Sequence, residues 1–339
     1  MEMESSENTA DQIYVSVIII TYNHERYISK ALDSVLSQVT NFKYEILIGD
    51  DASNDRTPDI LKKYEEKEVE DLFIYYRKDN LNATRNIYDL YKRAKGKYIA
   101  NLEGDDYWNS VEKLQLQINF LEKNNYIACT HDCLLVDVDG RKLENQNIEW
   151  ICSKTVFQLE DSKGFYLSGQ MATLVFRNIF KDSTDEDKYS IIWRAHPIIS
   201  DRVIQFILAS QGDIYHMDKN MSCYRVNLSK NASNATNKEF ANNVNSPYEN
   251  ILITKQLQNY IKVHQINKDI KFGETELRFY VSSVIRFIKK PSIQSLSVLM
   301  KIMAEFNFRG VIYFFLTPIE LAKLAYSRRI KEKMRWRKK

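Results

Sequence analysis

The stretches YEILIGDD at residues 44–51 and KYIANLEGDD at residues 97–106 share one plan, an apolar run that ends in paired acids. Short runs rich in β-branched and aromatic residues, bounded by glycine and aspartate, are typical of buried strands. In an open parallel sheet, ligands bind outside the carboxyl ends of the strands. Both acidic pairs are therefore expected at one edge, where like charges about 4 Å apart repel by about 4 kcal/mol at an effective dielectric constant near 20. Such repulsion favours a bound cation, and a divalent metal that holds a phosphate-bearing ligand fits this chemistry.

Around these two stretches, the first hundred residues alternate between strand and helix patterns. Four strands are expected, at residues 14–20, 44–49, 72–76 and 97–102. Apolar residues from Ile28 to Leu36 recur at helical spacing after the first strand. Thr57 is expected to cap the next helix, with Pro58 at its first position. The alternation predicts right-handed crossovers and a mostly parallel α/β sheet.

The composition divides the chain into four predicted parts. Residues 1–12 are polar and acidic and are expected to form a disordered tail, whereas residues 13–226 hold the strand and helix patterns. Residues 227–246 are rich in asparagine and serine, which predicts a surface linker, and residues 247–339 have helical patterns throughout. Within the second part, further helices are expected at residues 110–124 and 199–210, and extended segments at residues 127–138, 174–176 and 213–226.

Charge is unevenly distributed along the 339 residues. Residues 327–339 carry a net charge of +7, which leaves −4 on the rest of a chain whose total is +3. A basic patch confined to one end favours a local anionic partner and argues against a nucleic-acid groove along the body. No apolar run reaches 18 residues, so no membrane-spanning helix is expected.

The cysteines and the N-terminal residues bear on the compartment. The four cysteines lack paired metal-ligand spacing, and no secretory signal precedes them. We therefore expect reduced thiols and a cytoplasmic protein. The cysteines are Cys129, Cys133, Cys152 and Cys223.

Three segments taken together, SVIIITYN at residues 16–23, DDASNDRT at residues 50–57 and EGDD at residues 103–106, resemble the inverting family 2 glycosyltransferases. The likeness covers residues 13–226 and implies the GT-A fold, a doubly wound, mostly parallel sheet with flanking helices, here followed by a C-terminal helical region. The resemblance implies that Asp51 accepts the imide N–H of a uracil and that Thr21 and Tyr22 border the base. The residues alone leave another interpretation open, since an Asp-Asp-x-Ser-x-Asp-x-Thr run also suits a turn and a helix cap.

By the same resemblance, EGDD is a DxD-type motif that binds Mn²⁺ or Mg²⁺ between the two phosphates of the donor. Asp105 and Asp106 are the implied ligands, and one of the carboxylates, which we assign to Asp105, also contacts the donor. A metal there offsets the charge that builds on the leaving diphosphate, which is worth several kcal/mol. Many relatives have aspartate where Glu103 stands, which leaves open whether Glu103 ligates the metal. The residues alone leave open that the two aspartates merely start the following helix, although three acids within four positions exceed what a helix cap needs.

Two further residues are assigned by the resemblance. Arg85 matches a basic position near the donor phosphates or base, although a solvated arginine on an exposed helix is an equal alternative. Asp201 matches the catalytic carboxylate, the general base that takes the acceptor hydroxyl proton and typically contributes 10²–10⁴-fold. A helix cap is the commoner role for a residue placed like Asp201.

Two segments near the end of the resemblance have weaker assignments. SGQMAT at residues 168–173 falls where acceptors enter in relatives, although the residues alone predict only a turn. The closing segment YRVN at residues 224–227 has Asn227 where the family often has histidine, so a phosphate or metal contact sometimes supplied there is expected to be missing or altered.

The expected function is that of a metal-dependent glycosyltransferase of hexosyl type, which moves a sugar from a nucleotide diphosphate donor, foremost a UDP-sugar, to a glycan hydroxyl with inversion. Bacterial surface polysaccharide is the product that the resemblance implies. The alternative from another class is a non-catalytic nucleotide-sugar binder or membrane scaffold. A nucleotidyltransferase or a dinucleotide-dependent dehydrogenase is disfavoured because TYNH at residues 21–24 has no glycine.

The basic end of the chain adds an expectation about position. Apolar residues beside eight cations also suit a helix that lies on anionic lipid, at about 1 kcal/mol per basic residue. A peripheral position on the inner face of the plasma membrane would suit a lipid-linked glycan acceptor. The ordinary alternative is a solvated charged helix face.

Overall fold

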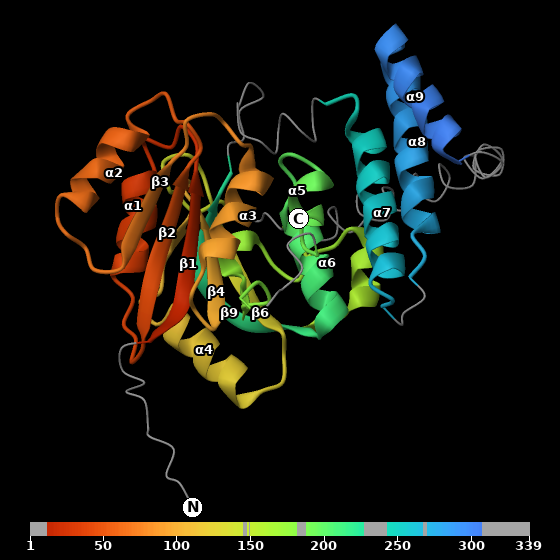
Figure 1. Ribbon diagram of the computed structural model, residues 1–339. Coiled ribbons are helices and arrows are strands. Elements are labelled where there is room, and N and C mark those ends of the chain that lie inside the picture. Colours follow the sequence, from red (N-terminus) through yellow and green to blue (C-terminus); the bar gives the residue numbers. More distant parts are fainter. Residues whose placement is uncertain are drawn as a thin grey trace, which may run out of the picture. The chain divides into compact units, whose positions relative to one another are not determined.

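The computed structural model describes residues 12–144, 148, 150–181, 188–226, 243–266 and 270–306. The chain divides into two compact units, residues 1–229 and residues 230–339. Figure 1 labels the helices and strands in chain order.

The first part of the N-terminal unit has the alternating order that the sequence predicts. Its strands are β1 (Ile13–Thr21), β2 (Lys43–Asp50), β3 (Leu72–Tyr76) and β4 (Tyr98–Glu103). They lie side by side in the order β3-β2-β1-β4, and every neighbouring pair is parallel. The helices between them are α1 (Ile28–Leu36), α2 (Thr57–Glu65) and α3 (Ala83–Arg93). The register sets Thr21 beside Asp50 and Ile20 beside Glu103, so the strands end at one edge.

The rest of the unit extends this sheet to nine strands. The added strands are β5 (Tyr107–Trp108), β6 (Ala128–Val136), β7 (Val156–Phe157), β8 (Val175–Arg177) and β9 (Ile214–Arg225). β8 is antiparallel to β4 and β6, whereas β6 and β9 are parallel to each other. The mostly parallel α/β sheet with helices that the sequence predicts is confirmed, and the two-residue strands β5 and β7 are additions to it.

The sheet is buried on both faces. Alternate residues of β1, β2 and β4 form one core with α1, α2 and α4 (Lys113–Lys123), in which Val17, Ile19 and Ile48 are fully buried. The opposite face carries α3, where the hydroxyl of Tyr91 donates to the Asn101 amide oxygen at 3.0 Å. Burial on both faces is what continuous apolar strands predict.

Two helix starts differ from the sequence prediction. Arg56, not Thr57, is the N-cap of α2, and Pro58 is the second helical residue. Thr57 has another role, because its Oγ1 accepts a hydrogen bond from the His24 amide at 2.9 Å. Asp55 replaces it as the capping side chain and accepts from the Thr57 amide at 2.9 Å. α4 begins at Lys113, three residues later than predicted.

Short helices and one long helix complete the N-terminal unit. They are η1 (Leu159–Gly164), η2 (Met171–Thr173), α5 (Ile191–Arg194) and α6 (Asp201–Gln211). α6 begins two residues later and ends one residue later than the predicted range 199–210, and Gly212 is its C-cap.

The C-terminal unit is helical over its described residues. Its helices are α7 (Ser246–Val263), α8 (Gly273–Lys289) and α9 (Ile293–Phe306), packed around Ile251, Tyr280, Val281, Val298 and Ile302. The basic run at residues 327–339, Asn227 and most of the predicted linker lie outside the described residues. Within the described part of the chain, no helix is both long and apolar enough to cross a membrane.

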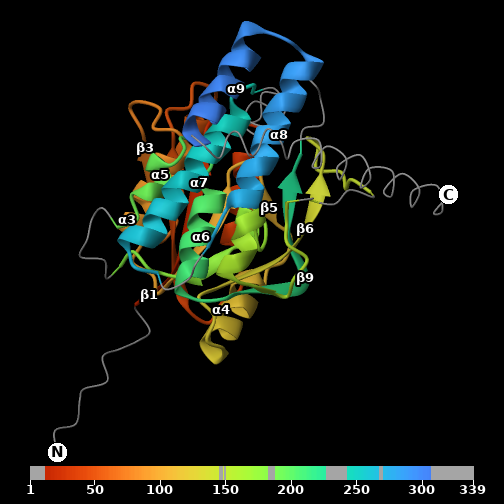
Figure 2. The ribbon, with the colours of Figure 1, turned by 90° about the vertical axis from the view of Figure 1, so that its right-hand side faces the viewer.

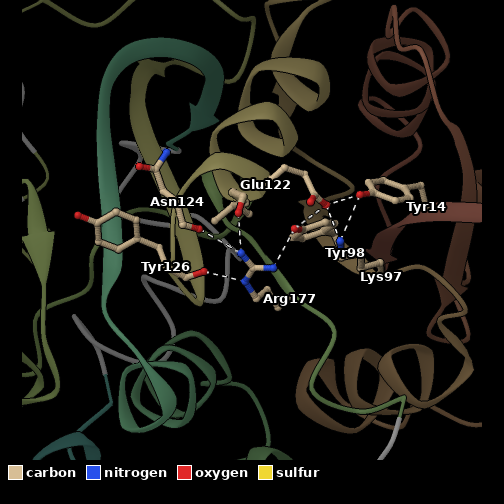
Figure 3. Close-up of polar contacts among 8 residues, drawn as sticks. Tyr14, Lys97, Tyr98, Glu122, Asn124, Tyr126 and Arg177 are labelled. Atoms are coloured by element: carbon tan, nitrogen blue, oxygen red, sulfur yellow. Dashed lines mark hydrogen bonds and ion pairs between the residues drawn. The ribbon is translucent and has the colours of Figure 1, made fainter.

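The starting edge of the sheet is held by Glu122, at the end of α4. Its Oε1 accepts hydrogen bonds from the Lys97 ammonium at 2.7 Å, from the Tyr98 hydroxyl at 2.9 Å and from the Tyr14 hydroxyl (Figure 3). Burial opposes ionisation here, yet these three donors lower the pKa of Glu122 to about 2. The network joins α4 to the first residues of β1 and β4.

Arg177, at the end of β8, is the second centre of this network. Its guanidinium donates to the carbonyl oxygens of Leu121 at 2.5 Å, Asn124 at 3.1 Å and Tyr126 at 2.9 Å, and to the hydroxyl of Tyr98 at 3.0 Å (Figure 3). One side chain therefore fixes the end of α4, the connection to β6 and the start of β4.

Candidate active site

The two acidic stretches converge on the end of β1. The Asp51 amide donates to the Thr21 carbonyl at 2.9 Å, and the Gly104 amide donates to the Ile20 carbonyl at 2.9 Å. A Cβ atom at Gly104 would lie 2.8 Å from Thr21 Oγ1 and 2.8 Å from His24 Nδ1. Glycine is therefore required for the second acidic stretch to approach the end of β1 this closely.

The loops after β1 and β2 are tied together by side chains of the DDASNDRT segment. The Asn23 amide donates to Ser53 Oγ at 2.8 Å, and the Asn54 amide donates to Asn23 Oδ1 at 2.9 Å. Asn23 and Ala52 have left-handed backbone conformations, with φ of 57° and 60°. These contacts, together with those of Asp55 and Thr57, give the later residues of the segment a structural role. Asp50 and Asp51 are left at the sheet edge.

The structure brings Asp51, Thr21 and Tyr22 to the same place. Asp51 is buried and its Oδ1 accepts a hydrogen bond from the Leu81 amide at 2.7 Å. Burial raises the pKa of Asp51, although that amide and the nearby Arg77 oppose the shift. Thr21 is buried, and its hydroxyl has no hydrogen-bond partner among the described residues. Tyr22 is 44% exposed, so its ring has a face free for stacking.

Arg85 has a different environment from Asp51, Thr21 and Tyr22. It is exposed on α3, and its guanidinium lies 5.3 Å from the centre of the Trp193 ring. The cation beside the first aspartate pair is Arg77, whose amide donates to the Asp50 carbonyl at 2.9 Å and whose guanidinium pairs with Asp89 at 2.7 Å. Its position directly after β3, the parallel neighbour of β2, is the sequence feature that would have identified it.

Gln170 connects two acids of the second stretch. Its Nε2 donates to Glu103 Oε2 at 2.9 Å and to Asp106 Oδ2 at 2.9 Å. Its Oε1 accepts from the Ala172 amide at 2.6 Å, which fixes the orientation of the side-chain amide. Gln170 is buried. A residue that the sequence places in a simple turn thus holds two carboxylates together.

Arg225, near the end of β9, holds the same stretch from the other side. Its amide donates to Asp106 Oδ1 at 2.8 Å, and its guanidinium donates to the Asp105 carbonyl at 2.8 Å and the Asp137 carbonyl at 3.0 Å. Both oxygens of Asp106 therefore accept a hydrogen bond from the protein. The Asp105 side chain is 34% exposed, and its Oδ2 lies 3.9 Å from His24 Nε2.

The acids of this cluster perturb one another. Burial first, and then the charges of Asp105 and Asp201, raise the pKa of Glu103 to about 8. Burial and the charges of Asp105 and Glu103 raise the pKa of Asp106 well above its ordinary value. Acidic side chains are thus concentrated at this edge, as the sequence predicts, and their raised pKa values favour the protonated forms of Glu103 and Asp106.

Asp201 lies in electrostatic reach of this cluster although it comes from α6. It is the first helical residue, after the N-cap Ser200, which makes no side-chain capping bond. Asp201 Oδ1 accepts from the Arg202 amide at 2.7 Å, and burial raises the pKa of its carboxyl. Gln205 of the same helix donates to the Gly169 carbonyl at 2.9 Å, which ties α6 to the loop of Gln170.

Trp108 extends the support behind the cluster. Its Nε1 donates to the Ala172 carbonyl at 3.0 Å, next to the Gln170 turn. The ammonium of Lys113 lies 4.1 Å from the centre of the Trp108 ring. Lys113 is fully buried, its Nζ has no hydrogen-bond partner in the described parts of the chain, and burial lowers its pKa to about 7.

The cluster suits a cation through its charge. Among the described residues, no three or more histidine, cysteine, aspartate or glutamate side chains are gathered as a metal site. Burial first, and then the neighbouring acids, raise the pKa values of Glu103 and Asp106, and a cation would offset the part that the acids contribute. Carboxylate oxygens are the ligands that Mg²⁺ and Mn²⁺ prefer. Asp105 is the more available ligand, because both oxygens of Asp106 already accept hydrogen bonds.

Comparison with known proteins identifies the family of this domain. The family model described as "Glycosyl transferase family 2" matches residues 16–183, which include both acidic stretches and Gln170. TuaG of Bacillus subtilis, a glycosyltransferase assigned to teichuronic acid biosynthesis, is 35% identical over 130 residues, 38% of this chain and 50% of TuaG. The poly(ribitol-phosphate) beta-glucosyltransferase of Bacillus spizizenii is 35% identical over 165 residues, 45% of this chain and 25% of that protein.

The fold also has a solved relative. The crystal structure of S. aureus TarS 1-349 in complex with UDP matches with a TM-score of 0.58 at 18% identity, over 88% of this chain and 82% of that chain, which is a likeness of fold. The chain spans at most half the length of the curated relatives named above. From the family match, the two Bacillus relatives and the shared fold, we conclude that this chain belongs to glycosyl transferase family 2 and carries its glycosyltransferase domain.

Proposed function

We propose that this protein transfers a sugar from a UDP-sugar to a hydroxyl group of a cell-wall or surface polysaccharide, with inversion at the anomeric carbon. One observation carries the proposal: segments around Asp51 and Asp105 meet at the end of β1, and Asp201 lies in reach of the same acids. The polysaccharide acceptor is supported by the names of the two Bacillus relatives, TuaG and the poly(ribitol-phosphate) beta-glucosyltransferase.

The residues at the end of β1 support uracil as the base. Asp51 is buried and its amide bonds to the carbonyl of Thr21, the residue before the exposed Tyr22, so an acceptor for the base edge and an aromatic residue for stacking come from adjoining segments. A carboxylate accepts the imide N–H of uracil, whereas the same ring position of cytosine is itself an acceptor. UDP is therefore expected to bind more tightly than CDP. TarS was crystallised with UDP, and its likeness to this chain is one of fold.

The acidic cluster would hold the donor diphosphate through a metal ion. Asp105, with Asp106 behind it, would bind Mn²⁺ or Mg²⁺, and the ion would supply positive charge against the leaving diphosphate. The role of Gln170 and Arg225 is to orient the carboxylates, since they bond to Glu103, to Asp106 and to the backbone of Asp105.

Asp201 is the proposed general base. The acceptor hydroxyl oxygen attacks the anomeric carbon, the bond from that carbon to the diphosphate oxygen breaks, and Asp201 takes the hydroxyl proton. The nucleotide diphosphate leaves with the bonding electrons. Burial raises the pKa of Asp201, which makes its carboxylate a stronger proton acceptor than an exposed aspartate.

The substitution Asp201→Asn tests this role. Transfer should fall by about 10²–10⁴-fold, because the amide accepts no proton, while UDP binding by calorimetry should stay unchanged. Asp59→Asn is the matched control, since Asp59 is an exposed residue of α2 and should retain full transfer. Full transfer by Asp201→Asn would remove Asp201 from the mechanism, and wild-type protein that binds UDP without transferring sugar to any tested glycan would favour the non-catalytic binder.

A thermal-shift screen tests the donor and the metal together. Nucleotide diphosphate sugars with uracil, cytosine or guanine bases are compared with and without Mn²⁺. The proposal expects stabilisation by the UDP-sugar that increases with Mn²⁺. Equal shifts for all bases would contradict the assignment of Asp51.

The place of the reaction is part of the proposal. We place it at the cytoplasmic side of the plasma membrane, held there by the basic run at residues 327–339. Deletion of this run should move the protein from the membrane fraction to the soluble fraction of a cell lysate. No shift would contradict the role of the run.

A further inference from the structure

Exposed apolar side chains lie at the end of α8 and along α9, on either side of the turn that joins them. Ile288 is 65% exposed, Ile293 89%, Leu296 44% and Met300 58%. We call these four residues the apolar stripe. The three on α9 recur at i, i+3 and i+7 and so share one face of that helix.

The stripe is additional to the core of the C-terminal unit. The other face of α9 supplies Val298, Ile302 and Phe306, which are buried against α8. Figure 2 shows α8 and α9 side by side with a short connection between them. α9 is therefore apolar on both sides, and the stripe is the side that the described residues leave exposed.

The residues around the stripe are cationic. Lys289 ends α8, Lys290 follows it in the turn, and Lys301 follows Met300 on α9; all three are exposed. From residue 277 to residue 304, the sequence has five lysines and arginines and no aspartate or glutamate. Apolar side chains bordered by lysines, without acids, are the composition of helices that lie in a bilayer interface.

We propose that the turn between α8 and α9 docks on the surface of an anionic lipid bilayer. The apolar stripe enters the boundary between headgroups and acyl chains, and the lysines contact lipid phosphates. A second copy of the chain fits the stripe less well than a bilayer does. In a two-fold contact through the stripe, the lysines of one copy would lie against the same lysines of the other, and these like charges repel. This surface is separate in sequence from the basic run at residues 327–339.

Co-sedimentation of the full chain with vesicles tests the proposal. Vesicles of phosphatidylcholine alone are compared with vesicles that also contain phosphatidylglycerol. The wild type should sediment with the anionic vesicles, and Lys289→Glu with Lys290→Glu should lower the partition coefficient by about tenfold or more. Lys62→Glu with Lys63→Glu is the matched control, because it makes the same change of net charge on exposed residues of α2 and should bind like the wild type.

A second variant tests the apolar contribution. Ile293→Ser with Leu296→Ser should weaken binding to the anionic vesicles by a similar factor and leave the circular dichroism spectrum unchanged, since both side chains are exposed. The proposal is overturned if the turn variants bind like the wild type, or if the α2 control loses as much binding as they do. A wild-type dimer that the serine variant dissociates, without any vesicle binding, would assign the stripe to a second copy instead.

Discussion

Two glutamates, Glu122 and Glu103, lie at opposite ends of β4 and differ in their hydrogen-bond donors and in the direction of their pKa shifts. At its first residue, the Tyr98 hydroxyl donates to Glu122, which also accepts from Lys97 and Tyr14, and the pKa of Glu122 is lowered to about 2. At its last residue, Glu103 has one amide donor, Gln170, and two acidic neighbours, and its pKa is raised to about 8.

The difference is one of burial first and of available donors second: burial is the largest cause of the raised pKa of Glu103, and a single amide donor opposes it. The starting edge supplies a cation and two hydroxyls to one carboxylate, so that carboxylate stabilises the fold. The carboxyl edge gathers several carboxylates around few donors, an arrangement that costs stability and is typical of functional sites. One sheet therefore combines a carboxylate with several donors at its starting edge and a cluster of acids with few donors at its carboxyl edge, where we propose that a metal ion binds.

The largest expected effect on the free energy of unfolding comes from adding a further acid to the cluster at the carboxyl edge. In the described structure, Gln170 is the only side-chain amide that bridges Glu103 and Asp106. Gln170→Glu puts a third carboxylate in place of this amide. We expect the free energy of unfolding at neutral pH to fall by about 3–5 kcal/mol, the usual cost of an uncompensated buried charge. Urea denaturation at neutral pH measures this.

Gln115→Glu is the control for that substitution. Gln115 lies on the outside of α4, where its side chain contacts Asn41 and Asn119, and the change there should stay within about 0.5 kcal/mol. If both variants lose the same small amount, Gln170 does not hold the acidic cluster together.

A second prediction compares the two ends of α4. Glu122 near its end has three donors, whereas Lys113 at its start is buried and its Nζ is without a hydrogen-bond partner among the described residues. Burial lowers the folded-state pKa of Lys113 to about 7, below the unfolded value of about 10.4, so between these values the unfolded state binds more protons. This group alone should raise the free energy of unfolding by roughly 2 kcal/mol between pH 7 and pH 9.

Lys113→Met tests that prediction, because methionine fills a similar volume without a charge. The variant should be more stable than the wild type at pH 7, and the difference should shrink as the pH rises to 9. Urea denaturation at several pH values gives both slopes. If the free energy of unfolding changes with pH in the same way for variant and wild type, Lys113 keeps its proton in the folded state. The cation–π contact with the Trp108 ring would then stabilise its charge.

The contrast between the two edges also separates what the sequence predicts from what it misses. The strands and their common edge follow from local apolar runs and from the parallel order, so the meeting of Asp51 with the EGDD stretch could be expected. Gln170 could not, because its bond to Asp106 spans 64 residues and follows no period. The two-residue strand β5 is likewise too short to leave a pattern.

Arg77 and Arg85 show where the residue chosen by resemblance differs from the residue that the structure places near Asp50 and Asp51. The resemblance directed attention to Arg85, on the first turn of α3, where the side chain lies over Trp193. Arg77 follows β3 directly and is fixed by Asp89 and Asn86, and these contacts depend on how α3 packs on the sheet. Packing of a helix against a strand is a tertiary property, so the sequence indicates the place of Arg77 after β3, whereas its contacts with Asp89 and Asn86 could be identified only from the fold.

The smallest expected effect is at the starting edge of the sheet. Glu122→Gln removes the charge that Lys97 contacts and should lower the free energy of unfolding by about 1 kcal/mol at pH 7, since the side chain is partly exposed and solvent screens the pair. The folded-state pKa of about 2 lies below the unfolded value of about 4.3, so this stability is present above pH 4.3 and is lost as the pH falls towards 2. Wild type and variant should therefore converge in urea denaturation near pH 2, whereas Glu66→Gln, an exposed residue after α2, should match the wild type throughout. If the variant remains less stable than the wild type by the same amount near pH 2, Glu122 stabilises the fold through packing and not through its charge. The two ends of β4 would then not differ in the electrostatic way described above.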